Sequence, residues 1–396
     1  MRNILLITSL YPSNDAKFKN NTSVCHYFAK EWVKMGYKVR VIYLYNEYPL
    51  ILYPLLKIAQ GILAERVSTA ILSERKHDEH SYLMDGINVT RIPIYKLKPH
   101  GDFSNNVIRS TTERIHKIIE DEGFRPNVIL GHCILPSIRI VAGLKEIYVD
   151  AVTAVTIHGI ESIKRQSVSG CFSKIDYLGY RSYPIKKSFE NIYGERPYFM
   201  CFSGVPADYV LQKEKSFTNG IHDFIYVGNF MQRKYPSALV PAIASNYPEG
   251  DFSITYVGDG KGIKLIQKKA SEYAIQSNIF FTGRIDRSEV TSYMDRSDVF
   301  IMISKAETFG LVYLEAMARG CITIASRNEG MDGIIVDGEN GFLCDAGDSN
   351  ELGSIIAKLK RMDSNTLQKI SKNAIITAAK MTDNKMAEKY IKSVVL

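Results

Sequence analysis

Apolar runs alternate with amphipathic stretches along most of the chain. Residues 3–9 are rich in Ile and Leu and predict a buried strand. Residues 22–35 carry apolar side chains at helical spacing and predict an amphipathic helix, which Gly36 ends. Residues 39–44 predict the next strand. This order predicts a parallel sheet with a right-handed crossover.

The alternation continues, and a second series starts at Asp223 after a stretch rich in Pro, Gly and polar residues at 203–220. We therefore expect an α/β fold of two Rossmann-like, doubly wound domains. Further strands are predicted at 127–131, 151–157, 224–227, 253–257, 279–282, 299–303 and 322–325, and helices at 236–246, 261–276, 288–296, 311–319 and 383–395.

One apolar stretch does not fit this alternation. Residues 48–72 are interrupted by Pro49, Pro54 and Gly61, and a polar run follows them. General considerations favour a core helix with a surface loop. The alternative is an interfacial helix that rests on a bilayer and reaches a lipid-linked acceptor.

Composition excludes several classes of protein. The 396 residues are 45% hydrophobic and 23% charged, which is ordinary for a globular chain of two or three domains. The net charge of +8 is spread along the chain, whereas a nucleic-acid binder concentrates it. A diffuse basic balance suits a nucleotide, a phosphorylated substrate, an anionic membrane surface or merely a solvated surface.

The six cysteines form no Cys-x-x-Cys pair and read as buried thiols of a reducing compartment. The apolar run at 4–7 is too short for a signal core or a membrane span, so we expect a cytoplasmic protein.

The strongest chemical signal is the segment from Glu307 to Glu315. The strand at 299–303 ends just before Glu307, and Gly310 allows close backbone approach where a helix starts. Free N–H groups at a helix N-terminus bind anions, so a diphosphate could be held around Gly310–Val312. Glu307 could then lie beside a sugar and Glu315 beside ribose hydroxyls. The alternative is an N-capping Glu before an ordinary helix.

This segment resembles the Glu-x7-Glu signature of family 4 of the retaining glycosyltransferases, which have the GT-B fold of two domains facing a cleft. The resemblance extends over about residues 223–360. Within that family, the chain is especially similar to enzymes that build capsule and O-antigen polysaccharides. It is carried by Asn278-Ile-Phe-Phe-Thr-Gly283, Glu307-Thr-Phe-Gly-Leu-Val-Tyr-Leu-Glu315, Ala316-Met-Ala-Arg-Gly320 and Asp337-Gly-Glu-Asn-Gly-Phe-Leu343.

A second turn resembles the Gly-Arg-x4-Lys element with which that family holds the donor diphosphate. Here it reads Gly228-Asn-Phe-Met-Gln-Arg-Lys234. Lys234 matches, Asn229 stands where arginine is usual, and Arg233 could substitute. Cations suit the place because the leaving diphosphate gains charge. The resemblance implies that the donor contacts Gly228, Asn229, Arg233, Lys234, Phe309, Gly310, Leu311, Val312 and Glu315.

In the first domain, Thr156-Ile-His158-Gly159 ends a buried strand and resembles the family's Thr-x-His-Gly. The resemblance implies that His158 approaches the transferred sugar and acts with Glu307 and Lys234 in catalysis. His132 matches a weaker, supportive position. A loop that usually carries a Gly-Gly pair reads Asn20-Asn21-Thr22 here. His132 and this loop are the expected acceptor side.

No Asp-x-Asp element is present, so we expect no metal and no cofactor. His77-Asp-Glu-His80 could chelate a metal but favours a surface loop. The resemblance implies an acceptor-binding domain at 1–205, a nucleotide-sugar domain at 206–378 and a returning C-terminal helix at 379–396.

The implied function is retaining transfer of a sugar from a UDP-sugar to a glycan or lipid-linked glycan, in surface polysaccharide biosynthesis. The implied partners are the donor, the acceptor and the inner membrane surface, with no nucleic acid. Three alternatives stay open. They are a nucleotide-sugar epimerase, a nicotinamide dehydrogenase that lacks the usual Gly-x-Gly-x-x-Gly fingerprint, and a non-catalytic sugar-binding component of an assembly complex.

Overall fold

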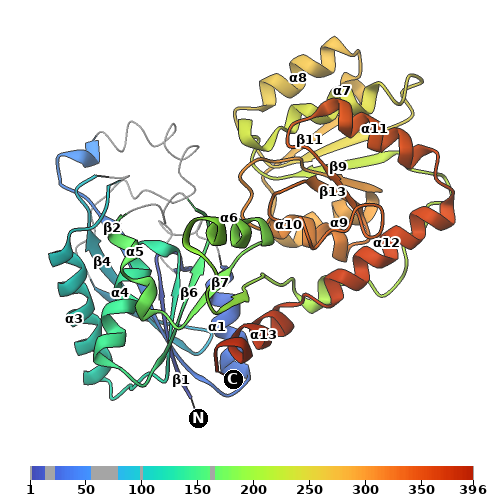
Figure 1. Ribbon diagram of the computed structural model, residues 1–396. Coiled ribbons are helices and arrows are strands. Elements are labelled where there is room, and N and C mark those ends of the chain that lie inside the picture. The colour runs from blue at the N-terminus through green and yellow to red at the C-terminus, as the bar shows by residue number, and fades with distance from the viewer. Residues whose placement is uncertain (1, 14–22, 55–78, 99–100, 161–165, 396) are drawn as a thin grey trace. The chain divides into compact units, whose positions relative to one another are not determined.

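A computed structural model of the protein describes residues 2–13, 23–54, 79–98, 101–160 and 166–395 (Figure 1). Contacts divide the chain into two compact units. Unit 1 comprises Met1–Arg181, Ile185–Cys201 and Met386–Leu396, and unit 2 comprises Ser182–Pro184 and Phe202–Lys385. Each unit is built on its own sheet, so the sequence-based prediction of two Rossmann-like α/β domains is confirmed.

The sheet of unit 1 has eight strands in the order β3-β4-β2-β1-β5-β6-β7-β8. All neighbours are parallel except β3, which pairs antiparallel with β4. The strands are β1 (Asn3–Thr8), β2 (Lys38–Glu47), β3 (His80–Met84), β4 (Ile87–Tyr95), β5 (Val128–His132), β6 (Val152–Ile157), β7 (Tyr177–Tyr180) and β8 (Tyr198–Met200).

Helices cover both faces of this sheet. The β1–α1–β2 and β5–α4–β6 crossovers step in opposite directions along the sheet, so right-handed connections place α1 and α4 on opposite faces. Helix α3 packs beside α4. The helices are α1 (Val24–Lys34), α3 (Asn105–Asp121), α4 (Ile134–Ile147), α5 (Gln166–Ser169), α6 (Tyr183–Tyr193) and α13 (Asp383–Val395).

Several elements of unit 1 were not predicted from the sequence. Strand β3 has mostly exposed side chains, so its apolar signal is weak, and it makes the sheet mixed instead of parallel. Strands β7 and β8 are only four and three residues long, too short to give a clear period. The predicted strands at 3–9, 39–44, 127–131 and 151–157 correspond to β1, β2, β5 and β6.

The sheet of unit 2 has six parallel strands in the order β11-β10-β9-β12-β13-β14. The five strands predicted for this half of the chain are confirmed, and the short β14 was missed. The strands are β9 (Asp223–Val227), β10 (Ser253–Val257), β11 (Ile279–Gly283), β12 (Val299–Ile301), β13 (Ile322–Ser326) and β14 (Phe342–Cys344).

The helices of unit 2 connect these strands and pack in pairs, α7 with α11 and α10 with α12. They are α7 (Leu239–Ala244), α8 (Ile263–Glu272), α9 (Arg287–Arg296), α10 (Leu311–Ala318), α11 (Ser349–Lys360) and α12 (Ser364–Ala379). Short 3-10 turns lie at η2 (Phe172–Lys174), η3 (Ala207–Tyr209), η4 (Gln232–Lys234), η5 (Pro236–Ala238) and η6 (Gln276–Asn278).

Each sheet has a point where the strand order reverses, and ligands of doubly wound folds bind outside the carboxyl ends of the strands there. In unit 2 this point lies between β9 and β12, and in unit 1 between β1 and β5. The loops that follow β9 and β12 therefore lie where such a fold binds its ligand, and they carry Lys234 and Glu307.

The last helix, α13, belongs to unit 1 from Met386 onward. Figure 1 shows it beside α1. The indole Nε1 of Trp32 donates to the carbonyl of Ala387 at 2.9 Å. The rings of Trp32 and Phe28 meet the ring of Tyr390 edge-on. Aromatic packing and this buried hydrogen bond thus hold the C-terminal segment against α1.

Of the apolar stretch 48–72, the structure describes residues 48–54, and 55–72 lie outside the described residues, as do His77 and Asp78. Leu50 and Ile51 are 64% and 79% exposed. Within the described ranges, no helix has the length and apolarity needed to cross a bilayer. Contact of this stretch with a membrane stays a prediction.

Candidate functional site

The loop after β12 brings Glu307 to the carboxyl edge of the unit 2 sheet. Its carboxylate lies 3.6 Å from the Lys234 Nζ and 3.9 Å from the Arg233 guanidinium. The side chains of Glu307 and Lys234 are 14% and 15% exposed. Two predicted site residues, 73 positions apart in the chain (307 − 234), therefore form one half-buried ion pair at the switch point.

Burial lowers the pKa of Lys234, and the Glu307 carboxylate opposes that shift. Lys234 also packs against the Met302 sulfur at 3.7 Å. In the part of the chain that the structure describes, Lys234 and Arg233 share the Glu307 carboxylate as their recorded ion-pair partner. The turn can therefore accept an anion such as a diphosphate.

The turn itself is shaped by two strand-end glycines. A Cβ on Gly258 would lie 2.1 Å from the carbonyl oxygen of Gly228, so the turns after β9 and β10 touch through their backbones. A Cβ on Gly260 would lie 2.8 Å from the Phe230 nitrogen. The run Val257-Gly-Asp-Gly260 is thus a tight turn that packs under the lysine-bearing loop.

Asn229 is exposed, and the contacts recorded for it in the described structure involve its backbone carbonyl. Arg233 instead donates from Nη1 to the carbonyls of Lys305 and Ala306, at 3.3 and 3.4 Å. Of the two residues considered for the second cation of the turn, Arg233 is the one that reaches the Glu307 loop.

Helix α10 begins at this loop with Gly310 as its N-cap, at φ +82°. A Cβ there would lie 2.3 Å from the Tyr313 ring, so only glycine fits. The Tyr313 hydroxyl donates to the Met302 carbonyl at 2.7 Å and meets the Ser304 hydroxyl at 2.9 Å. These bonds pin the start of α10 to the end of β12.

The tip of α10 is open to solvent in part, because Gly310, Leu311 and Val312 are all partly exposed within unit 2. The first N–H groups of an α-helix have no partner inside the helix. Those of Leu311 and Val312 could therefore donate to an anion, and binding of a diphosphate there stays a prediction. Phe309, in contrast, is 2% exposed and stacks on Phe202, which makes it a packing residue of this loop.

Glu315 lies one turn into α10 and is 7% exposed. Its carboxylate accepts from Nε of Arg287 on α9 at 2.7 Å and lies 2.5 Å from Nη2. Burial raises the pKa of Glu315, and the Arg287 guanidinium opposes that shift. Arg287 was not predicted from the sequence, because its only signal is its proximity to Glu315 in the folded unit.

In unit 1, His158 follows β6 at the carboxyl edge of the sheet. Burial lowers its pKa to about 3, and the Arg181 guanidinium acts in the same direction. His158 is therefore neutral at physiological pH. A neutral imidazole can orient a hydroxyl by donating or accepting one hydrogen bond.

His132 is 0% exposed and its ring lies 5.7 Å from that of His158. Its Nε2 is within 3.1 Å of the Tyr390 hydroxyl and 3.3 Å of the Thr156 hydroxyl. The geometry places His132 between β6 and α13, so it holds the C-terminal helix. Asn20, Asn21 and Thr22 lie outside the described residues.

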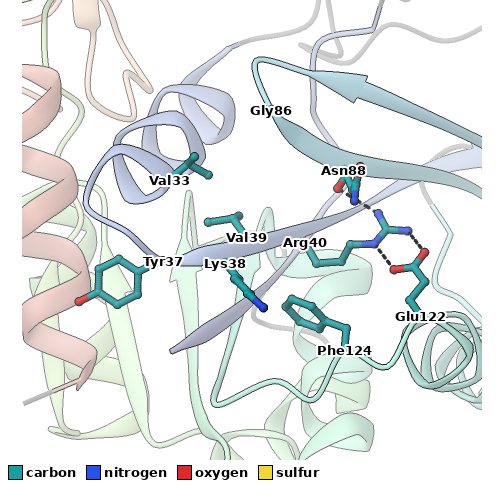
Figure 2. Close-up of a pocket in the computed structure, with 9 residues that line it drawn as sticks. All are labelled: Val33, Tyr37, Lys38, Val39, Arg40, Gly86, Asn88, Glu122 and Phe124. Carbon is teal, nitrogen blue, oxygen red and sulfur yellow. Dashed lines mark hydrogen bonds and ion pairs between the residues drawn. The ribbon is translucent and has the colours of Figure 1, made fainter. Parts of the chain in front are cut away.

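A pocket of about 540 Å³ lies elsewhere in unit 1 (Figure 2). It opens at the amino ends of β2 and β4, opposite the edge that carries His158. Arg40 inside it donates to the Glu122 carboxylate from Nε at 2.7 Å and from Nη2 at 2.6 Å. Its remaining donors reach Val41, Asn88 and Thr90. All three nitrogens of the Arg40 guanidinium thus donate hydrogen bonds within unit 1, so we interpret the pocket as structural.

All six cysteines are free thiols, and four of them are buried. Among the described residues, no group of three or more His, Cys, Asp or Glu side chains is arranged to hold a metal ion. Donor binding without a metal stays a prediction.

Comparison with known protein families matches residues 211–377 to the model described as glycosyl transferases group 1. This stretch contains the Lys234 turn, the Glu307 loop and α10. This match covers less than half of the chain. Over these residues the chain is thus similar to a family of sugar-transferring enzymes.

Two curated relatives illustrate the match. The chain is 33% identical over 139 residues to the N-acetyl-alpha-D-glucosaminyl L-malate synthase of Bacillus anthracis, which covers 35% of this chain and 36% of the relative. It is 29% identical over 253 residues to the uncharacterized glycosyltransferase MJ1178 of Methanocaldococcus jannaschii, covering 61% of this chain and 67% of the relative. The match to the Bacillus anthracis relative spans little more than a third of that protein's length.

Solved structures share the fold of the whole chain. A glycosyltransferase from Rickettsia africae superposes with a TM-score of 0.69 at 16% identity, covering 99% of this chain and 97% of that one. Anabaena Alr3699/HepE in complex with UDP superposes with a TM-score of 0.69 at 15% identity, covering 99% of both chains. The chain therefore has the two Rossmann-like units of the GT-B fold.

Proposed function

We propose that the protein is a retaining glycosyltransferase that moves a sugar from a UDP-sugar to a glycan or lipid-linked glycan acceptor. One observation carries the proposal. At the switch point of unit 2, the half-buried Lys234–Glu307 pair lies beside the open tip of α10, and the buried Glu315 lies one turn into that helix. The lysine and the helix N–H groups suit the diphosphate of a nucleotide sugar, and the two glutamates suit its ribose and its transferred sugar.

Each part of the donor has a partner in this arrangement. The diphosphate would lie against Lys234 and the first N–H groups of α10, because both favour negative charge. Glu315 would accept hydrogen bonds from the ribose hydroxyls, and Glu307 would contact the transferred sugar. We assign Arg233 the second cation of the site, since it lies beside Glu307 and Asn229 is exposed. His158 would orient the sugar from unit 1.

The chemical step needs no protein nucleophile. The acceptor oxygen bonds to the anomeric carbon on the face that the diphosphate leaves, while the bond from that carbon to the phosphate oxygen breaks. The acceptor proton passes to the departing phosphate oxygen. Lys234 stabilises the negative charge that develops on the diphosphate, and the anomeric configuration is retained.

The relatives support this choice of substrate. One relative, 30% identical over 133 residues, is the lipopolysaccharide core biosynthesis glycosyltransferase LpsE of Rhizobium meliloti. The Anabaena neighbour was solved with UDP and with UDP-glucose. These similarities are compatible with the role that we propose, which is cytoplasmic assembly of a surface polysaccharide from a UDP-sugar without a metal or cofactor.

Melting curves with a panel of UDP-, GDP-, ADP- and TDP-sugars test the donor, because a ligand of the native state raises the melting temperature. We expect a rise with UDP-sugars. Calorimetry should then show UDP binding weakened about tenfold or more by Glu315→Ala, since a charge-assisted hydrogen bond is lost. Exposed Glu339→Ala is the control. Unchanged affinity in Glu315→Ala would contradict the ribose assignment.

Product analysis separates the remaining alternatives. Incubation of the pure protein with a UDP-sugar and no acceptor should release UDP only slowly, as hydrolysis. Conversion to an epimeric sugar would identify an epimerase instead. Binding without any turnover, with acceptor glycans supplied, would favour a non-catalytic sugar-binding component.

A further inference from the structure

The loop that carries Glu307 adopts an unfavourable backbone conformation. Ala306 has φ +57°, in the left-handed region that side chains other than glycine and asparagine rarely occupy. Lys305 and Ala306 are exposed, so burial of their side chains does not hold this conformation. Polar contacts to the backbone must therefore stabilise it.

One such contact comes from Glu329, on the loop that follows β13. One oxygen of its carboxylate accepts the N–H of Ala306 at 2.9 Å, and the other accepts the N–H of Glu307 at 2.7 Å. Successive backbone N–H groups next to a left-handed residue form a concave site for an anion. Here the anion is a side chain of the same unit, and it binds the backbone of the predicted catalytic residue itself.

The opposite side of the loop is held by Arg233. The N–H of Lys305 donates to the Arg233 carbonyl at 2.7 Å, and the Arg233 guanidinium donates to the carbonyls of Lys305 and Ala306. The backbone of Lys305–Glu307 thus lies between a carboxylate that takes its N–H groups and a guanidinium that donates to its carbonyls.

The residue after Glu329 adds a steric contact. A Cβ on Gly330 would lie 2.6 Å from the backbone of Phe309. The chain at Gly330 therefore presses directly on the continuation of the same loop. Its position is fixed by a turn in which the Asp332 N–H donates to the Glu329 carbonyl at 3.0 Å and the Asp332 carboxylate accepts the Asn328 N–H at 2.6 Å.

We propose that Glu329 is a positioning residue that fixes where the Glu307 carboxylate lies and which way it points. Gly330 supports this arrangement sterically. Without Glu329, the two N–H groups lose their acceptor and the loop relaxes out of the left-handed conformation. The effect of Glu329 on the loop backbone follows from the contacts alone. Its consequence for the sugar rests on the proposed function, in which Glu307 contacts the transferred sugar.

Amide hydrogen exchange tests the backbone statement without any substrate. In Glu329→Gln, one carboxylate oxygen becomes an amide group that cannot accept, so exchange at Ala306 or Glu307 should accelerate about tenfold or more. The amides within α10 should change little. Glu351→Gln is the matched control, because Glu351 accepts the N–H of Asp345 at 2.6 Å in the same unit. It should accelerate exchange at Asp345 and leave residues 306–307 unchanged. Equal protection of 306–307 in Glu329→Gln and wild type would overturn the proposal.

Calorimetry with UDP and UDP-glucose tests the consequence for the sugar. Glu329→Gln should leave the UDP affinity within about twofold and reduce the extra affinity for UDP-glucose about fivefold, with a lower kcat for UDP release. Glu329→Asp, which keeps both oxygens, should recover part of each loss. Equal losses for both ligands, with a lower melting temperature, would show a merely structural role and overturn the proposal.

Gly330→Ala provides an independent variant. We expect it to reproduce the lower kcat, because its new methyl group collides with the Phe309 backbone. Gly353→Ala is its control, since that Cβ meets its nearest neighbour at 3.6 Å, an ordinary contact. A kcat for Gly330→Ala equal to that of the control would contradict the steric part. If the wild type binds no nucleotide or nucleotide sugar, the proposed function fails, and the exchange experiment still decides the role of Glu329.

Discussion

The carboxyl edges of the two sheets differ in the charged and titratable side chains that lie there. In unit 2, charged side chains that are partly or fully buried face each other in pairs, Lys234 with Glu307 and Arg287 with Glu315. Burial shifts the pKa values of Lys234 and Glu315 toward neutrality, and each partner opposes the shift. In unit 1, the buried groups are His132 and His158, whose pKa values are lowered by burial and again by the positive Arg181.

The difference indicates what each edge is suited to bind. Paired side chains of opposite charge leave the cationic side of unit 2 able to take up a polyanion. Neutral imidazoles cannot balance the charge of a diphosphate. They can order the hydroxyl groups of a sugar without changing the net charge of the site. The experiments below test this division, from the largest expected effect to the smallest.

Removing the charge of Lys234 should have the largest effect. Lys234→Met keeps an aliphatic side chain against Met302 and removes the nearer of the two cations recorded beside Glu307. We expect a 10²- to 10³-fold loss in kcat/KM for the donor, the range seen when one group that stabilises transition-state charge is lost. Steady-state kinetics with a UDP-sugar measure it, with Lys264→Met on α8 as the exposed control. A loss below tenfold would mean that the diphosphate lies elsewhere.

The histidines of unit 1 predict a pH dependence of stability. The pKa of His158 is about 3 in the folded state against 6.5 in a model peptide, so the unfolded chain takes up the proton first as the pH falls. Its contribution to stability is present above pH 6.5 and is lost toward pH 3, by about 1.4 kcal/mol per pH unit. His132, whose pKa is also lowered, adds to the loss.

Denaturant titrations between pH 7 and 4 measure this slope. His158→Asn should reduce this pH dependence by about the amount expected for one titrating proton. His222→Asn is the control of opposite sign, because the backbone carbonyl of Asp251 raises the pKa of His222. That contribution is present below pH 6.5 and is lost as the pH rises. An identical slope in wild type and His158→Asn would show that the buried imidazole is not neutral, and the contrast between the units would fail.

The smallest effect is expected at Arg287. Without its guanidinium, burial alone acts on Glu315, so the pKa of that carboxyl rises further and protonation removes an acceptor for ribose. Arg287→Met should weaken UDP binding three- to tenfold near neutrality, which is about 1 kcal/mol, and more as the pH falls. Calorimetry across pH 5 to 8 measures it. Arg296→Met, on the same helix, should follow the wild type. Parallel pH profiles for Arg287→Met and wild type would contradict the role.

The sequence by itself determined the repeating elements and the loops that carry the chemistry. Hydrophobic periodicity and turn glycines act over a few neighbouring residues, so β1, β5, β9 and β12 and the turns at Gly228 and Gly310 could be read locally. Elements with weak local signals could not. The exposed β3 and the short β7, β8 and β14 are strands only because a neighbouring strand pairs with them.

Only the tertiary structure decided which side chains support the site. Glu329 reaches Glu307 across 22 residues, Arg287 reaches Glu315 across 28, and Tyr390 reaches His132 across 258. Such pairs have no spacing that a pattern could reveal. They arise because the crossovers bring the carboxyl ends of distant strands to one edge, where buried polar groups must find partners.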